Sequence, residues 1–69
     1  MSKTNYDLLK AKLLEKRYTY DDGAKAIGKS TTTFSDKMNG KSKFDVVEAR
    51  KLKELLDMTV EEYVTIFLN

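Results

Sequence analysis

The chain contains no cysteine, histidine, proline or tryptophan, and only three glycines among its 69 residues. Without cysteine it can form neither disulfide bonds nor thiolate metal sites. Without histidine it lacks the commonest general base and the commonest metal ligand, so we expect no enzymatic activity, no cofactor and no metal. A chain this short is expected to fold as a single domain, residues 1–69, held together by apolar packing.

Long hydrophobic runs are also missing. No stretch approaches the ~20 apolar residues that span a bilayer, and the first residues lack the apolar core of a signal peptide. The net charge is only +2, but residues 1–17 and 29–43 each sum to +3, while residues 44–69 sum to −3. This distribution fits a face built for an anionic partner, and it equally fits an ordinary solvated surface.

Helix-start and helix-end signals divide the chain into five segments. The expected helices follow the capping residues Thr4, Thr19, Ser30, Asp45 and Thr59. They end near Arg17, Ile27, Asn39, Leu56 and Leu68, respectively. Acidic residues three positions later, Asp7 after Thr4 and Glu48 after Asp45, predict two capping boxes. Gly28 stands where a left-handed C-terminal cap is needed.

Apolar residues recur at helical spacing and predict the core. The first helix contributes Tyr6, Leu9 and Leu13, with Leu8 and Leu14 widening the stripe. The other expected core residues are Ala24, Ile27, Phe34, Met38, Phe44, Val46 or Val47, Ala49, Leu52, Leu55, Leu56 and Met58. The last helix carries more apolar residues than one buried face can use.

Residues 19–40 form the most informative segment: a short helix, a turn that contains Gly28, and a second short helix. Ala24 is small enough to let two steeply crossing helices touch. Phe34 is expected to hold the second helix to the core. The residues then left on its outer side are Thr31, Thr32, Ser35 and Asp36.

Those outward residues are short and polar, as in a recognition helix whose N-terminal residues reach base edges in the major groove. Threonine has a low helix propensity, so the run Ser30–Thr33 is a poor choice for a purely structural helix. A capping and turn cluster without a partner explains the same run, and it is the simpler interpretation when the run is taken alone.

Residues 20–63 resemble the DNA-binding domain of phage lambda repressor, with which they align without a gap. The shared features are Ala24, Gly28, the step Asn39-Gly40, Ala49, Leu52 and the stretch 59–63. The resemblance implies an all-α, compact five-helix bundle that contains a helix-turn-helix at residues 19–40. It also implies a sequence-specific transcriptional regulator that binds double-stranded DNA, with no small-molecule substrate and no membrane partner.

The resemblance assigns roles to individual positions. Base contacts are expected from Thr31, Thr32 and Ser35. DNA backbone contacts are expected from Tyr20, Lys29, Asn39, Lys41, Ser42 and Lys43. Lys3 is expected on an N-terminal arm that also reaches the DNA. Each lysine is equally well explained as a solvated charge.

Three positions depart from the family pattern. Gly23 replaces a large apolar residue, so the second helix is expected to be less well anchored. Tyr20 replaces a glutamine that supports a base contact in the family, which leaves that role open. Asp36 adds a negative charge to the recognition helix. It can accept from a cytosine amino group or point away from the DNA, and we expect the second because an unpaired carboxylate near phosphates is unfavourable.

One such domain offers few base contacts, so regulators of this kind bind as dimers to two half-sites about 34 Å apart. The expected dimer surface comprises Val64, Phe67 and Leu68. The alternative is that these residues complete the core of the monomer. The short chain favours a Cro-type phage repressor of the bacterial cytoplasm over the DNA-binding domain of a longer repressor.

Two other classes of protein are alternatives to a DNA-binding regulator. A protein-interaction module such as an antitoxin would use the apolar last helix and its acidic flank, and would have little affinity for DNA. An enzyme would need a catalytic pair, and the adjacent acids Asp21-Asp22 and Glu61-Glu62 are the candidates. Both pairs lie in first turns of expected helices, where the helix dipole explains acidic residues.

Overall fold

The computed structural model describes residues 4–68, and within that range the chain forms five α-helices and no strands. The helices are α1 (Tyr6–Glu15), α2 (Tyr20–Ile27), α3 (Thr31–Met38), α4 (Val46–Leu55) and α5 (Val60–Phe67). The all-helical class is therefore confirmed, and the helices lie where their capping and spacing signals predicted them, apart from the start of α1. Over the same residues, none of the helices has the length and apolar character needed to cross a bilayer.

Side-chain caps open every helix. Thr19, Asp45 and Thr59 each form a complete capping box with the acidic residue three positions on, and Ser30 caps α3 by accepting from the backbone N–H of Thr33 at 3.2 Å. These bonds satisfy backbone donors that a helix start otherwise leaves free.

The prediction for the start of α1 is wrong by one residue. Asn5, not Thr4, is the N-cap, and its Oδ1 accepts from the backbone N–H of Leu8 at 3.2 Å. The backbone N–H of Asn5 donates to the carbonyl of Ile66 at 2.7 Å, which ties the start of α1 to the end of α5. Thr4 is buried instead of capping the helix, so the predicted box with Asp7 does not form.

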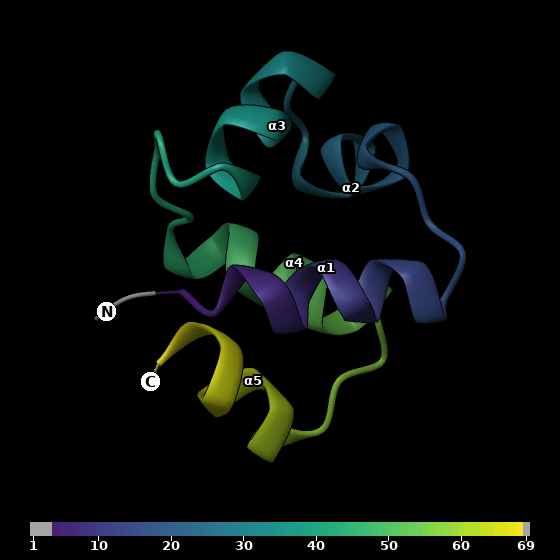
Figure 1. Cartoon of the computed structure of the whole chain (residues 1–69), viewed down its shortest axis with the longest axis vertical. Helices are drawn as coiled ribbons and strands as arrows, with labels where there is room; N and C mark the ends of the chain where they lie inside the picture. Colours follow the sequence, from purple (N-terminus) through teal and green to yellow (C-terminus); the bar gives the residue numbers. More distant parts are fainter. Residues whose placement is uncertain (1–3, 69) are drawn as a thin grey trace.

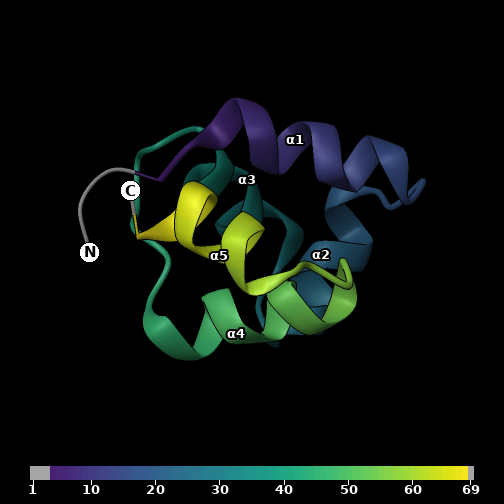
Figure 2. The same cartoon turned by 90° about the horizontal axis from the view of Figure 1, so that it is seen from below.

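Figure 1 shows α3 and α2 at one end of the molecule, α1 and α4 across the middle, and α5 at the opposite end. In Figure 2 the same α5 lies between α1 on one side and α4 on the other. Helix α2 packs against both α3 and α4, and α5 packs against α1. Helices α2 and α3 are therefore held to the rest of the bundle through the packing of α2 against α4.

A chain of aromatic rings runs through the core. Edge-to-face contacts join Tyr20 to Phe34 (5.5 Å between ring centroids), Phe34 to Phe44 (5.9 Å) and Phe44 to Phe67 (5.8 Å), and Tyr63 lies 5.6 Å from Phe67. Such pairs stabilise by about 0.5–1.5 kcal/mol beyond their buried area. The chain connects α2, α3, the segment before α4, and α5 into one core.

Some predicted core positions lie on the surface. Val46 and Val47 are both exposed in the first turn of α4, and Leu8 and Leu14 are exposed on α1. The predicted alternative of Val46 or Val47 as a core residue is wrong because Phe44, just before the cap, is the residue that turns into the core at this point.

Gly23 has the opposite effect from the one expected of it. A Cβ atom built on Gly23 would lie 2.4 Å from Cζ of Phe34 and 2.8 Å from both neighbouring ring carbons. The ring of Phe34 therefore occupies the space that a side chain at position 23 would need. The expectation that glycine weakens the anchoring of α2 is wrong. Because Gly23 has no side chain, the buried ring of Phe34 packs directly against its backbone.

The substitution Gly23→Ala tests this contact by the sign of its effect. Helix propensity alone predicts stabilisation by about 1 kcal/mol, whereas crowding against Phe34 predicts destabilisation by about 1–3 kcal/mol. We expect destabilisation, measured as a lower free energy of unfolding in urea. In a Phe34→Leu background the same substitution should cost less, and a Gly23→Ala protein more stable than wild type would contradict the contact.

A second prediction concerns acid stability. The side-chain hydrogen bond from Lys12 and the backbone N–H of Thr59 hold the pKa of Glu62 below its ordinary value of 4.5. A carboxyl group with a lowered folded-state pKa stabilises the fold above its unfolded pKa, and that stabilisation is lost as pH falls through the folded pKa. Glu62→Gln should therefore lower the melting temperature near pH 7 and leave it nearly unchanged near pH 2.

Glu61→Gln is the matched control, since Glu61 is an exposed acid in the same first turn. The measurement is the melting temperature of the wild type, Glu62→Gln and Glu61→Gln between about pH 2 and pH 7, and the loss near pH 7 should be larger for Glu62→Gln than for Glu61→Gln. An equal loss for Glu62→Gln at both ends of the range would rule out the charge of Glu62 as the cause.

Candidate nucleic-acid interface

Helix α3 has two sharply different sides. Phe34 and Met38 are fully buried and hold it to the bundle, while Thr31 and Thr32 in its first turn are exposed. The predicted orientation of α3 is therefore confirmed for Thr31 and Thr32, whereas Ser35 and Asp36, also predicted to face outward, are half-buried. Figure 1 shows the helix at the end of the molecule, where its outer side is not covered by another helix.

A three-residue turn sets the angle between α2 and α3. Gly28 adopts the left-handed conformation predicted for it, with φ of 73°, which residues with a Cβ atom adopt only at a cost. The backbone N–H of Lys29 then donates to the carbonyl of Ala24 at 3.0 Å, and Ser30 caps α3. Ala24 is buried in the core.

The four hydroxyl residues at the start of α3 divide into two pairs. Ser30 caps the helix, and its Oγ donates to Oγ1 of Thr33 at 3.0 Å, so both serve the helix start. Thr31 and Thr32 remain on the exposed side. Capping thus explains Ser30 and Thr33, whereas Thr31 and Thr32 are exposed and available to a partner.

Thr31 is oriented by α2. Its Oγ1 donates to Oδ1 of Asp21 at 3.1 Å, and Oδ2 of Asp21 lies 3.3 Å from Nζ of Lys25. All three groups are exposed, so this arrangement adds little stability. Its consequence is geometric, since the hydroxyl of Thr31 donates its hydrogen to Asp21 and keeps its oxygen as an acceptor.

The second turn of α3 brings two other predicted residues together. Nδ2 of Asn39 lies 3.4 Å from Oγ of Ser35, to which it donates. Ser35 is half-buried and Asn39 is exposed, and Asp36 beside them is half-buried.

Basic and polar residues flank both ends of α3. Lys29 precedes the helix, and Lys41, Ser42 and Lys43 follow it in the loop to α4; all four are exposed. Tyr20 is half-buried, with its ring packed edge-on against Phe34. Its ring therefore belongs partly to the core. Lys3 lies outside the described residues.

One basic residue of this region was not anticipated as a structural group. Lys37 is buried, with its Nζ 3.0 Å from Oε1 of Glu48 and 2.9 Å from the carbonyl oxygen of Lys43. Its ammonium also lies 5.9 Å from the centre of the Phe44 ring. The signal was present in the spacing, because Lys37 follows the buried Phe34 by three residues and so shares its side of the helix.

The predicted dimer surface needs a correction. Phe67 is fully buried, in contact with the rings of Phe44 and Tyr63, and it completes the core of the monomer. Its assignment to a dimer surface is wrong. Val64 on α5 and Leu68, the C-cap just after it, are exposed. Helix α5 lies at the end of the molecule opposite α3 (Figure 1).

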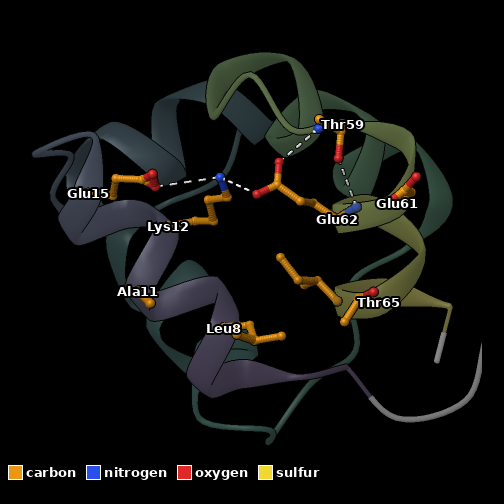
Figure 3. Close-up of a pocket in the computed structure, with 9 residues that line it drawn as sticks. Leu8, Ala11, Lys12, Glu15, Thr59, Glu61, Glu62 and Thr65 are labelled. Carbon is orange, nitrogen blue, oxygen red and sulfur yellow. Dashed lines mark hydrogen bonds and ion pairs between the residues drawn. The ribbon is translucent and has the colours of Figure 1, made fainter.

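A hollow of about 420 Å³ lies between α1 and α5, remote from α3 (Figure 3). Leu8 and Ile66 form part of its apolar wall. Lys12 bridges its other end, pairing with Glu62 and, at 3.5 Å, with Glu15. The hydrogen bond with Glu62 raises the pKa of Lys12 above its ordinary value of 10.5.

Comparisons of this chain with protein-family models, with curated proteins and with solved structures find no match. The case for a function therefore depends on the chemistry and placement of α2, α3 and the loop after α3.

Proposed function

We propose that this protein is a sequence-specific DNA-binding transcriptional regulator, in which α2 and α3 act as a helix-turn-helix of the lambda repressor and Cro kind. The observation that carries the proposal is the two-sided α3, held by Phe34 and Met38 so that Thr31 and Thr32 face outward at its N-terminal turn. That turn is the part of a recognition helix that meets base edges in the major groove.

The exposed threonines suit base reading. A hydroxyl can donate to or accept from several base edges, and a threonine methyl group can touch the methyl group of thymine. Thr31 and Thr32 provide both groups in successive positions, and Ser35 with Asn39 adds a second polar site one turn further on. We assign base contacts to Thr31, Thr32 and Ser35.

The residues around α3 suit contact with phosphates. Lys29 lies at one end of the helix, and Lys41 and Lys43 lie at the other. Contacts of this kind position a protein on the duplex without reading sequence. Asn39, Ser42 and Tyr20 are assigned the same role.

We further propose that two copies bind a palindromic operator, because a single α3 offers few base contacts. With Phe67 in the core, the exposed apolar residues left here are Val60 and Val64 on α5 and Leu68 just after it. Val60 and Val64 are four residues apart and so share one side of the helix. Val64 and Leu68, with Val60, form the proposed dimer surface.

The decisive experiment is selection of binding sites from random DNA, performed with the wild type and with Thr32→Ala. We expect the wild type to recover a palindrome. Thr32→Ala should relax the preference at one position of each half-site and weaken specific binding by about 1–3 kcal/mol, as for the loss of one base contact.

Thr65→Ala is the matched control, since it removes an exposed threonine from α5. It should leave the recovered sequence unchanged. If the wild type recovers no consensus, and its binding to DNA does not weaken as salt rises, the function proposed here is wrong and a protein-interaction role takes its place.

Lys43→Ala tests the phosphate contacts. It should weaken binding to specific and non-specific DNA alike, and reduce the slope of log affinity against log salt by about 1. Lys51→Ala makes the same charge change on an exposed part of α4 and should have a smaller effect. A loss for Lys43→Ala confined to one DNA sequence would assign Lys43 to base reading instead.

A further inference from the structure

We infer that Lys37 is a positioning residue that holds the loop of residues 41–43 in the shape needed to meet DNA phosphates. The inference rests on the proposed DNA-binding function. Lys37 does not face the solvent side of α3, so it is not itself a DNA contact. It acts through the backbone of Lys43.

The contacts of Lys37 converge on the loop and on the start of α4. Its Nζ donates to the carbonyl oxygen of Lys43 at 2.9 Å and pairs with Oε1 of Glu48 at 3.0 Å. The side chains of Lys37 and Glu48 are only 11% and 4% exposed. Both contacts are therefore shielded from water and are stronger than surface contacts of the same geometry.

Glu48 extends this network into the cap of α4. The same Oε1 accepts from the backbone N–H of Asp45 at 3.0 Å, and Oδ1 of Asp45 accepts from the backbone N–H of Glu48 at 2.7 Å. The carboxylate of Glu48 thus joins the helix start to the ammonium of Lys37. The far end of the loop is fixed by this chain of contacts.

The near end of the loop is fixed by α3 itself. The backbone N–H of Gly40 donates to the carbonyl of Lys37 at 3.2 Å, and that of Lys41 donates to the carbonyl of Asp36 at 2.9 Å. Residues 41–43 therefore form a short loop that is fixed at one end to α3 and at the other end to Lys37. The side chains of Lys41, Ser42 and Lys43 are exposed.

Packing alone does not require a lysine at position 37. A buried ion pair replaced by apolar residues of similar volume often leaves stability unchanged or raises it. What an apolar residue cannot supply is the donor to the carbonyl of Lys43. Without that donor, the carbonyl must turn toward water, and the backbone that directs the side chain of Lys43 turns with it.

The test is the double variant Lys37→Met with Glu48→Gln, which preserves net charge, approximate volume and an acceptor for the cap of α4. We expect it to fold and its core amides to stay protected. Among residues 41–43, the amide hydrogen of Lys41 is held by its bond to the carbonyl of Asp36. Its exchange, measured by NMR without DNA, should accelerate about tenfold, as for a local opening made easier.

The matched control is Lys12→Met with Glu62→Gln. Glu62 caps α5 as Glu48 caps α4, and it pairs with a lysine of another helix in the same way, but this pair lies between α1 and α5. The control should leave exchange of the Lys41 amide unchanged. Unchanged exchange in the Lys37 variant as well would overturn the inference, whether or not the protein binds DNA.

Binding to the operator recovered by selection is the second readout. The Lys37 variant should bind about tenfold more weakly, the effect of one charge-assisted hydrogen bond, and with a shallower salt slope, while the control binds as wild type. A loosened loop with unchanged affinity would overturn the positioning role. A wild type without any affinity for DNA would reject the proposed function, and the exchange data would still report on the loop.

If the Met–Gln variant does not fold, the same measurements apply to Lys37→Leu with Glu48→Gln. Leucine, like methionine, supplies no donor to the carbonyl of Lys43, and the glutamine keeps an acceptor for the cap of α4. Faster exchange of the Lys41 amide supports the inference, and wild-type exchange rejects it.

Discussion

The ring of Phe34 lies directly on the backbone of Gly23, in space that any side chain at position 23 would occupy. This contact sets how closely α2 and α3 approach, and Ala24 beside Gly23 is also buried. The Phe34 ring also contacts Phe44, which in turn contacts Phe67 of α5. The placement of α3 therefore depends on the same core into which α5 packs. The exposed side of α3 is thereby held in a defined orientation.

Two lysine–glutamate pairs connect the helices in the same way. Glu48 and Glu62 each occupy the third position of a helix with a capping box, and each pairs with a lysine on a different helix, Lys37 and Lys12. One carboxylate thus satisfies backbone donors at a helix start and ties that start to a neighbour. For a small domain without disulfides, such links supplement a limited apolar core.

Much of the fold could be predicted because its signals are local. The five helices follow from caps and stripes that depend on residues three or four apart, and Gly28 is marked by the conformation that its turn requires. The buried and exposed sides of α3 follow from helical spacing around Phe34. The predicted base and phosphate contacts remain predictions, since they depend on a partner.

The sequence by itself thus determined the helical class, the positions of the helices, and which side of α3 is polar. The tertiary structure alone decided that Gly23 seats a ring, that Phe67 is internal, and that Lys37 is a buried link instead of a surface charge. Each of these depends on groups from separate segments meeting in space. Helical spacing reports the face on which a residue lies, but not the ring, carbonyl or carboxylate that it meets there.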